Sequence, residues 1–265
     1  MRPLYTARLD RKLLLSASAQ CYHLEFCIDA LARFDFEAGQ FLSFVAPDAQ
    51  GKEQTRAYSI ASAPDANRFA LCVNRVENGF FSNLLCDLAE GDTLACHGPH
   101  GTFVLREPLT HSLCIATGTG IAPMRGFAQA LFPATSEDRS GGKDFFLVYG
   151  TRYAGDVYYQ DYFEDLAARY PNFHYVATLS RAEASWTGAQ GYVQEHAARL
   201  LATFAAGHAA PPTSPDAPAA PPDPAAAAFE MHAYVCGLNQ MVSASRERLK
   251  ALGWHRKQII FERYD

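Results

Sequence analysis

The stretch "ATGTGIAPMRG", residues Ala116–Gly126, places a glycine-rich turn directly after an apolar run and before a helical segment. The glycines allow a tight turn and a close backbone approach by a ligand, and the start of the helix offers free N–H groups to a phosphate. The spacing differs from GxGxxG, because "IAP" follows Gly118 and Gly120. The proline of that triplet suits the first turn of a helix. The sequence therefore predicts a phosphate site at the end of a strand.

The chain around this turn alternates between strand-like and helical segments. The helical segments are "APMRGFAQALF", "YYQDYFEDLAARY", "VQEHAARLLATF" and "NQMVSASRERLKALG". The apolar runs between them are typical of parallel strands and cover Ser112–Gly118, Asp144–Arg152, Phe173–Arg181, His232–Gly237 and Gln258–Tyr264. Such alternation predicts a doubly wound α/β domain, in which helices cover both faces of a parallel sheet.

The residues before Glu107-Pro108 follow a different pattern. Short runs rich in β-branched and aromatic residues are punctuated by Gly, Pro, Asp and Asn, and a helix is expected after Gly79. The strands expected here are Cys21–Ile28, Gly39–Pro47, "RAYSIAS", Arg68–Val76 and Asp92–Pro99. This spacing favours a small antiparallel barrel or sandwich. We therefore predict an antiparallel β-barrel domain over 1–107 and a doubly wound α/β domain over 108–265.

Composition limits the possible partners and location. Apolar residues make up 49% and charged residues 19% of the 265 residues, as in globular proteins. The net charge of −5 argues against binding to nucleic acid. No apolar stretch approaches the ~20 residues of a membrane span, and no signal peptide is evident. We expect a cytoplasmic protein with a flexible Ala/Pro-rich insertion over 205–228.

The seven cysteines are scattered and form neither CxxC nor the Cx4CxxC spacing of an iron–sulfur site. Most lie in apolar runs, where a free cysteine behaves as a small hydrophobic residue. We therefore predict no metal site. Cys236 differs, because Gly237 and a helix follow its strand in a second strand–glycine–helix arrangement. It is either a buried structural thiol or a thiol beside the ligand of that turn.

Ser180 and Arg181 end a predicted strand at the edge where ligands bind in open α/β sheets. A serine hydroxyl beside an arginine fork suits a phosphate monoester. A surface arginine that caps a loop would show the same pattern, so both interpretations stay open.

Seven motifs follow one another along almost the whole chain: "RAYS", "GFFS", "GPHG", "GTGIAP", "SR", "CG" and the terminal "FERY". In this order and spacing they resemble the ferredoxin–NADP reductase superfamily. The segments "GFFSNLLCDLAEGD", "VYYQDYFEDL" and "GYVQ" are similar to the plant and bacterial enzymes. The resemblance implies FAD and NADP(H) as cofactors.

The resemblance assigns FAD to the first domain. Arg56 matches the residue that pairs with the flavin pyrophosphate, Tyr58 the aromatic on the isoalloxazine, and Ser59 the hydroxyl near N5. Gly79 and Ser82 match the turn and helix start that receive the pyrophosphate. Further residues expected at FAD are Ala57, Val73, Asn74, Phe80 and Phe81.

Strand periodicity puts Arg56 and Tyr58 on one face and Ser59 on the other. We therefore expect the strand to be irregular at Ser59.

The resemblance assigns NADP(H) to the second domain. The turn under the nucleotide corresponds to Gly118, Thr119, Gly120, Ile121 and Pro123. Ser180 and Arg181 match the 2′-phosphate site, and Tyr192 an aromatic that stacks on adenine.

Near the nicotinamide, the resemblance places the thiol of Cys236, the adjoining Gly237 and the carboxylate of Glu262. Ser59, Cys236 and Glu262 are therefore the catalytic candidates. Tyr264 matches the aromatic that covers the flavin face. The chain departs from the plant enzymes at Asp265, which follows that aromatic.

The resemblance implies a ferredoxin–NADP reductase that passes single electrons to a separate ferredoxin or flavodoxin. A docking patch for this partner is expected at Arg8, Arg11, Lys12, Arg33 and Arg75. The alternatives are an NAD(P)H-dependent reductase of an oxygenase, of free flavin or of quinone, and a non-catalytic flavin-binding subunit.

Overall fold

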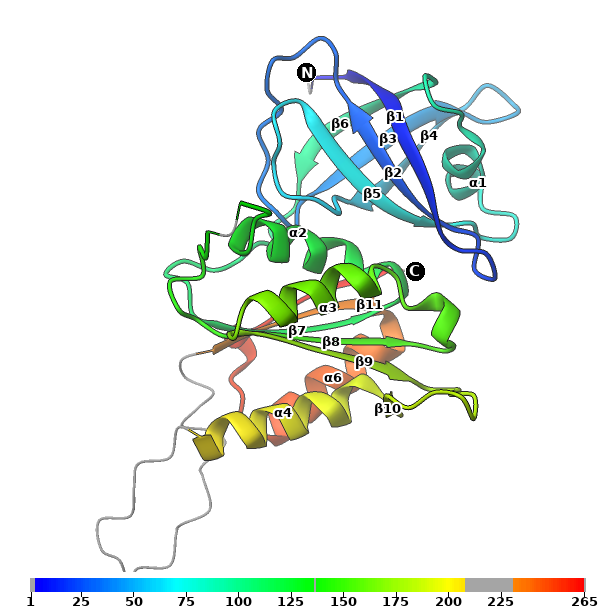
Figure 1. Ribbon diagram of the computed structural model, residues 1–265. Helices are drawn as coiled ribbons and strands as arrows, with labels where there is room; N and C mark the ends of the chain where they lie inside the picture. The colour runs from blue at the N-terminus through cyan, green and yellow to red at the C-terminus, as the bar shows by residue number, and fades with distance from the viewer. Residues whose placement is uncertain (1–2, 136, 208–230, 265) are drawn as a thin grey trace, which may run out of the picture.

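The computed structural model describes residues 3–135, 137–207 and 231–264, and it contains two six-stranded sheets (Figure 1). The first sheet is antiparallel, and Ile60 bridges to Leu71 between its two edge strands. Its strands, in the order β4-β3-β6-β1-β2-β5, are β1 (Tyr5–Ser16), β2 (Cys21–Cys27), β3 (Phe41–Pro47), β4 (Glu53–Ser59), β5 (Arg68–Asn74) and β6 (Thr93–His100). Helix α1 (Phe80–Asp87) begins directly after Gly79, as predicted. The antiparallel first domain is therefore confirmed.

The second sheet is parallel and carries helices on both faces (Figure 1). Its strands, in the order β10-β9-β8-β7-β11-β12, are β7 (His111–Thr117), β8 (Phe145–Thr151), β9 (Phe173–Leu179), β10 (Ala189–Gln190), β11 (Met231–Leu238) and β12 (Ile259–Tyr264). Helices α2 (Ile121–Leu131) and α3 (Gln160–Arg169) pack on one face, while α4 (Val193–Gly207) and α6 (Asn239–Ala251) pack on the other. Short 3-10 turns lie at η1 (Gly118–Gly120), η2 (Ala154–Asp156) and η3 (Arg256–Gln258). The doubly wound fold is confirmed.

Strand β1 was not expected from the sequence. Its buried residues Ala7 and Leu9 alternate with polar side chains, but Leu13 and Leu14 are exposed and break the alternation. The strand nevertheless lies inside the first sheet, between β6 and β2. Of the predicted flexible segment, residues 205–207 belong to helix α4 instead, and residues 208–228 lie outside the described residues.

The two domains share one buried core. Cys21, Ala61 and Cys72 of the barrel pack with residues of α2 and α3 in a single hydrophobic cluster. Polar contacts surround it: the Tyr158 hydroxyl donates to Asn74 Oδ1 (3.1 Å), and His23 Nδ1 shares a hydrogen bond with the Tyr159 hydroxyl (2.9 Å). Because apolar contacts continue across the boundary, the barrel and the parallel sheet hold a defined relative position.

We predict that His23→Gln makes stability less dependent on pH in the acid range. Burial, and then the positive charges of Arg125 and Arg11, lower the His23 pKa from 6.5 to about 3. The folded chain therefore favours the neutral imidazole. As pH falls from about 6.5 towards 3, protonation of His23 in the unfolded chain lowers the stability of the fold, by at most about tenfold in the folding constant per pH unit. Urea unfolding at several pH values measures this difference. Parallel pH profiles for the two proteins would contradict it.

Candidate active site

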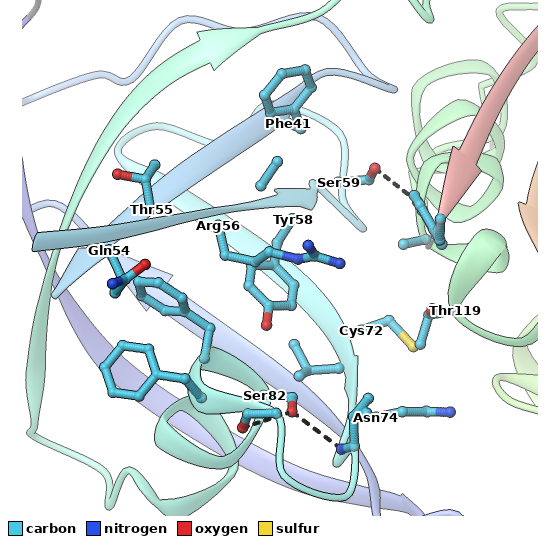
Figure 2. A pocket seen from close by; sticks show the side chains of 18 of the residues that line it. Phe41, Gln54, Thr55, Arg56, Tyr58, Ser59, Cys72, Asn74, Ser82 and Thr119 are labelled. Carbon is cyan, nitrogen blue, oxygen red and sulfur yellow. Dashed lines mark hydrogen bonds between the residues drawn. The ribbon is translucent and has the colours of Figure 1, made fainter. Parts of the chain in front are cut away.

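A cavity of about 1060 Å³ lies between the barrel and the parallel sheet (Figure 2). Its wall comes from β4, β5, the start of α1, the turn before α2 and the end of β12. The site residues expected from the sequence that line it are Arg56, Ala57, Tyr58, Ser59, Val73, Asn74, Gly79, Phe80, Phe81, Ser82, Thr119, Glu262 and Tyr264. Residues separated by up to about two hundred positions in the sequence are thus brought to one cavity.

Strand β4 presents Arg56 and Tyr58 on the same face, and both side chains extend into the cavity (Figure 2). Burial raises the pKa of Tyr58 to about 12, against the charge of Arg56, so this phenol is neutral at ordinary pH. Its ring packs edge-on against Phe44, with centroids 6.1 Å apart. The strand thus offers a guanidinium and a fixed aromatic ring side by side.

The prediction that the strand is irregular at Ser59 is wrong, because β4 pairs with β3 in a regular register. The register is regular from Pro47↔Glu53 to Phe41↔Ser59. The strand instead ends at Ser59, and the next residue, Ile60, bridges to Leu71 of β5. Ser59 reaches the cavity because it is the last residue of its strand.

The start of helix α1 forms another part of the wall. No side chain caps its first N–H groups, and the capping position is Gly79. A Cβ at Gly79 would come within 2.4 Å of Ser82 Oγ, so the turn leaves no space for a larger residue. The Ser82 hydroxyl accepts from Val76 N (3.1 Å) and lies 3.3 Å from the Gly79 carbonyl oxygen, to which it donates. The hydroxyl therefore shapes the turn, while the helix N–H groups remain for an anion.

The glycine turn lies where the strand order of the parallel sheet reverses, between β7 and β11. Ligands of doubly wound sheets bind outside the carboxyl ends of the strands at this point. Gly118 has φ +54°, and a Cβ there would meet no atom within 4 Å, whereas a Cβ at Gly120 would lie 2.2 Å from the Cys236 carbonyl oxygen. Gly118 thus supplies a left-handed conformation beside open space, and Gly120 allows close packing on β11. The buried Oγ1 of Thr117, just before the turn, has no hydrogen-bond partner among the described residues.

A hydrogen-bonded chain joins the two domains at the end of the cavity. The Tyr264 hydroxyl donates to Ser59 Oγ (2.7 Å), and the Ser59 hydroxyl donates to Glu262 Oε2 (2.9 Å). Burial raises the pKa of Glu262 above its ordinary value, and the Ser59 bond acts against this shift. Burial also raises the pKa of Tyr264. Tyrosine, serine and carboxyl thus form a relay at the meeting point of β4 and β12.

Cys236 does not line the cavity, because it is fully buried beneath this chain. Burial raises its pKa, the Glu262 charge adds to the rise, and contact with the Tyr264 hydroxyl opposes it. The thiol is therefore protonated at ordinary pH, which fits a positional role and excludes a thiolate nucleophile in this state.

Ser180, Arg181 and Tyr192 lie away from the cavity on the exposed surface beyond β9 and β10. Arg181 Nη1 donates to the Tyr153 hydroxyl at 3.4 Å, and the Tyr192 side chain is 69% exposed. Ser180 and Arg181 follow the carboxyl end of β9, at the same edge of the sheet as the glycine turn. An extended ligand on the turn can therefore span the two places, whereas a small one cannot.

Some residues at the site were not expected from the sequence. Arg263 and Phe41 line the cavity, and Thr117 carries the unpartnered hydroxyl. Arg263 and Thr117 had a signal, since they lie inside the motifs "FERY" and "ATGTGIAPMRG", whereas Phe41 had none beyond its place in a predicted strand. No group of three or more His, Cys, Asp or Glu side chains that could hold a metal ion occurs within 3–135, 137–207 and 231–264. Over the same ranges, none of the helices is both long and apolar enough to cross a membrane.

We predict that Glu262→Gln changes the pH dependence of stability in the opposite sense to His23→Gln. Because the folded-state pKa of Glu262 lies above 4.5, the folded chain binds this proton more tightly than the unfolded chain. The resulting stabilisation is complete below the unfolded pKa and is lost as pH rises through the folded pKa. The stability difference, wild type minus variant, should therefore fall with rising pH in urea unfolding. A difference that is constant with pH would contradict the shift.

Comparison with known proteins identifies both domains. Residues 6–105 match the oxidoreductase FAD-binding domain and residues 114–247 the oxidoreductase NAD-binding domain. The chain is 41% identical over 236 residues to "Ferredoxin--NADP reductase B" of Sorangium cellulosum, covering 88% of this chain and 86% of that protein. It is 27% identical to the "Toluate 1,2-dioxygenase electron transfer component" of Pseudomonas putida, over 89% of this chain but 60% of that protein.

The fold also matches solved structures. The ferredoxin-NADP+ reductase from Plasmodium falciparum has a TM-score of 0.77 at 20% identity, with 98% of this chain and 96% of that chain covered. The ferredoxin reductase in carbazole 1,9a-dioxygenase has a TM-score of 0.75 at 23% identity, with 99% of this chain and 70% of that chain covered. The chain belongs to the ferredoxin–NADP reductase family of oxidoreductases, with an FAD-binding barrel followed by a pyridine-nucleotide-binding domain.

Proposed function

We propose that the chain is a ferredoxin–NADP reductase, which moves a hydride between NADP(H) and FAD and exchanges single electrons with a separate ferredoxin or flavodoxin. The observation that carries this proposal is the double contact of Ser59, the last residue of the barrel strand, with Glu262 and Tyr264 of the second domain. This contact joins the wall of the cavity to the edge of the parallel sheet at which the glycine turn lies. The 41% identity to a ferredoxin–NADP reductase supports the same choice.

The cavity fits FAD in size and chemistry. Its volume of about 1060 Å³ lies just above the usual range of about 300–1,000 Å³ for small-molecule sites, as suits a ligand as large as a dinucleotide. Arg56 and the uncapped N–H groups of α1 would bind the pyrophosphate, and the Tyr58 ring would pack on the isoalloxazine. The small Gly79 and buried Ser82 would keep the turn close to the phosphates.

The second domain fits a pyridine nucleotide that carries a 2′-phosphate. The turn at Gly118, with open space above it, would receive the pyrophosphate, and the unpartnered Thr117 hydroxyl supplies a further hydrogen-bonding group. Ser180 and Arg181 would bind the 2′-phosphate, and the exposed Tyr192 ring would stack on the adenine. We assign NADP(H) over NAD(H) on the Ser180–Arg181 pair.

The residues at the junction would orient the reactants and hold one proton. FAD supplies the conversion between two-electron and one-electron transfer when it is bound. Tyr264 holds the place beside Ser59 and has to leave it before the nicotinamide can reach the flavin. Loss of the hydrogen bond to Ser59 would cost about 1 kcal/mol, exposure of the ring would add to this cost, and nucleotide binding would have to supply both.

Once Tyr264 has moved, Ser59 Oγ loses the hydrogen bond that it accepts, and its own hydroxyl would donate to the flavin edge by turning away from Glu262. Glu262, with its raised pKa, would hold or accept a proton through Ser59 Oγ. The protonated thiol of Cys236 would then form the floor under the nicotinamide. These roles need no covalent intermediate on the protein.

The expected docking patch is not an unpaired cationic surface. All five of its side chains bond within the barrel: Arg8 with Asp10 and Asp29, Arg11 with Glu25, Lys12 with the carbonyls of Cys86 and Leu88, Arg33 with Asp35, and Arg75 with Asp87. Exposed ion pairs add little and are screened by salt. The proposal of an acidic carrier as partner therefore rests on the family and not on this patch.

A second candidate is the reductase component of an oxygenase. The similarity to the toluate dioxygenase component favours it, although this chain covers only 60% of that protein. A clear preference for NADPH over NADH in wild type, lost in Arg181→Ala, would favour the first candidate over this one.

We predict that Arg181→Ala lowers kcat/KM for NADPH by about tenfold or more and leaves that for NADH almost unchanged. The guanidinium would pair with the 2′-phosphate, which NADH lacks, and a charge-assisted bond contributes about 1.5–3 kcal/mol. Steady-state kinetics with both coenzymes measure the change. Arg139→Ala is the control, because Arg139 is also exposed but pairs with Glu137 in another loop. An unchanged NADPH preference in Arg181→Ala would refute the assignment.

A further inference from the structure

Arg125 links the nucleotide turn to the flavin side of the cavity. It lies in the first turns of α2, the helix that continues from the glycine turn at Gly118–Gly120. Its Nη1 donates to the carbonyl oxygen of Ala61 at 2.6 Å. Ala61 follows Ser59 by two residues, at the point where the chain leaves β4. One side chain therefore connects the elements that carry the two halves of the proposed site.

The Arg125 guanidinium is held from several sides. Its carbon lies 4.9 Å from the ring centroid of Tyr159 and 5.3 Å from that of Tyr162, both near the start of α3. Its Nε is buried and has no hydrogen-bond partner among the described residues. The side chain is thus fixed by two aromatic rings and one carbonyl oxygen.

This arrangement is an inefficient way to gain stability. In the part of the chain that the structure describes, no carboxylate forms an ion pair with the half-buried Arg125, so one carbonyl oxygen and two rings compensate its charge only in part. Arg125 lines a second cavity, of about 690 Å³, together with three other arginines. Each of these three has a carboxylate partner: Arg68 pairs with Asp10, Arg139 with Glu137 and Arg169 with Asp165. An apolar side chain over the tyrosines would pack at lower cost, so the position of the guanidinium points to a role beyond stability.

Two neighbouring contacts show how closely α2 approaches the same segment. Ala63 N donates to Gln129 Oε1 of α2 at 3.1 Å. A Cβ at Gly126 would lie 3.0 Å from the carbonyl oxygen of Ser62. Residues 61–63 therefore each contact α2, and Arg125 supplies the charged hydrogen bond of this contact, at the residue nearest Ser59.

We propose that Arg125 is a positioning residue for hydride transfer, which fixes the distance between the glycine turn and Ser59. The proposal rests on the proposed function. Hydride transfer requires reacting atoms about 3–3.5 Å apart, and a displacement of about 1 Å can cost on the order of 10²-fold in rate. Arg125 lines neither the FAD cavity nor the proposed 2′-phosphate site. Its loss should therefore lower the rate of hydride transfer and leave the affinity for either cofactor unchanged.

The test uses the FAD-loaded full chain and three variants. Arg125→Ala removes the contact, Arg125→Lys keeps a charged donor without the planar fork, and Arg139→Ala removes a charge from the same cavity. Anaerobic stopped-flow at saturating NADPH gives the rate constant of flavin reduction per bound FAD. We expect a decrease of about tenfold or more for Arg125→Ala, a smaller one for Arg125→Lys and none for Arg139→Ala, with the dissociation constant for NADPH within about twofold throughout.

Chemical rescue gives a second readout. Because Arg125 lines a cavity open to solvent, added guanidinium should restore part of the rate of Arg125→Ala, and sodium chloride at equal ionic strength should not. A third readout needs no cofactor: amide hydrogen exchange at Ala61 and Ala63 in the apoprotein should be faster in Arg125→Ala than in Arg139→Ala.

Several results would overturn the proposal. An unchanged rate constant per bound FAD in Arg125→Ala would do so, as would a rate that falls only because FAD is lost. Unchanged exchange at Ala61 and Ala63 would show that Arg125 does not hold this segment. A wild-type chain whose flavin is reduced by neither NADPH nor NADH would instead refute the proposed function, and the positioning role with it.

Discussion

The buried contact between the barrel and helices α2 and α3 determines the geometry of the cavity and of the hydrogen bonds that join the two domains. Cys21, Ala61 and Cys72 are barrel residues, yet they pack in the same hydrophobic cluster as the core of the parallel sheet. Because this core is continuous, the end of β4 and the end of β12 meet at hydrogen-bonding distance. Without it, the cavity wall and the nucleotide turn would belong to independently moving domains.

The relay of Tyr264, Ser59 and Glu262 illustrates what this constraint produces. Burial keeps the Tyr264 phenol and the Cys236 thiol protonated. It also raises the pKa of Glu262 above its ordinary value, which is typical of carboxyl groups that take part in proton transfer. The protein thus places neutral hydrogen-bonding groups where the two domains meet, whereas Arg181 lies away from the cavity on the exposed surface.

The sequence was sufficient for the order and type of the main elements, because these depend on local patterns. The glycine turn, the start of α1 after Gly79 and the alternation of strand and helix are short-range signals. Strand β1 was missed because Leu13 and Leu14 face outward and hide its alternation. The predicted bend at Ser59 was wrong because the strand end, and not a distortion, brings its hydroxyl to the site. The contact of Ser59 with Glu262 spans 203 residues, and no local pattern encodes such a contact.

The most direct test of this account is an anaerobic titration of the FAD-reconstituted chain with NADPH, followed by the visible absorbance of the flavin. We expect NADPH to reduce the flavin stoichiometrically and NADH to be markedly less effective at equal concentration. The reduced flavin should then be reoxidised by an added one-electron acceptor protein. A chain that does not retain FAD, or whose flavin absorbance is unchanged by either coenzyme, would contradict the account.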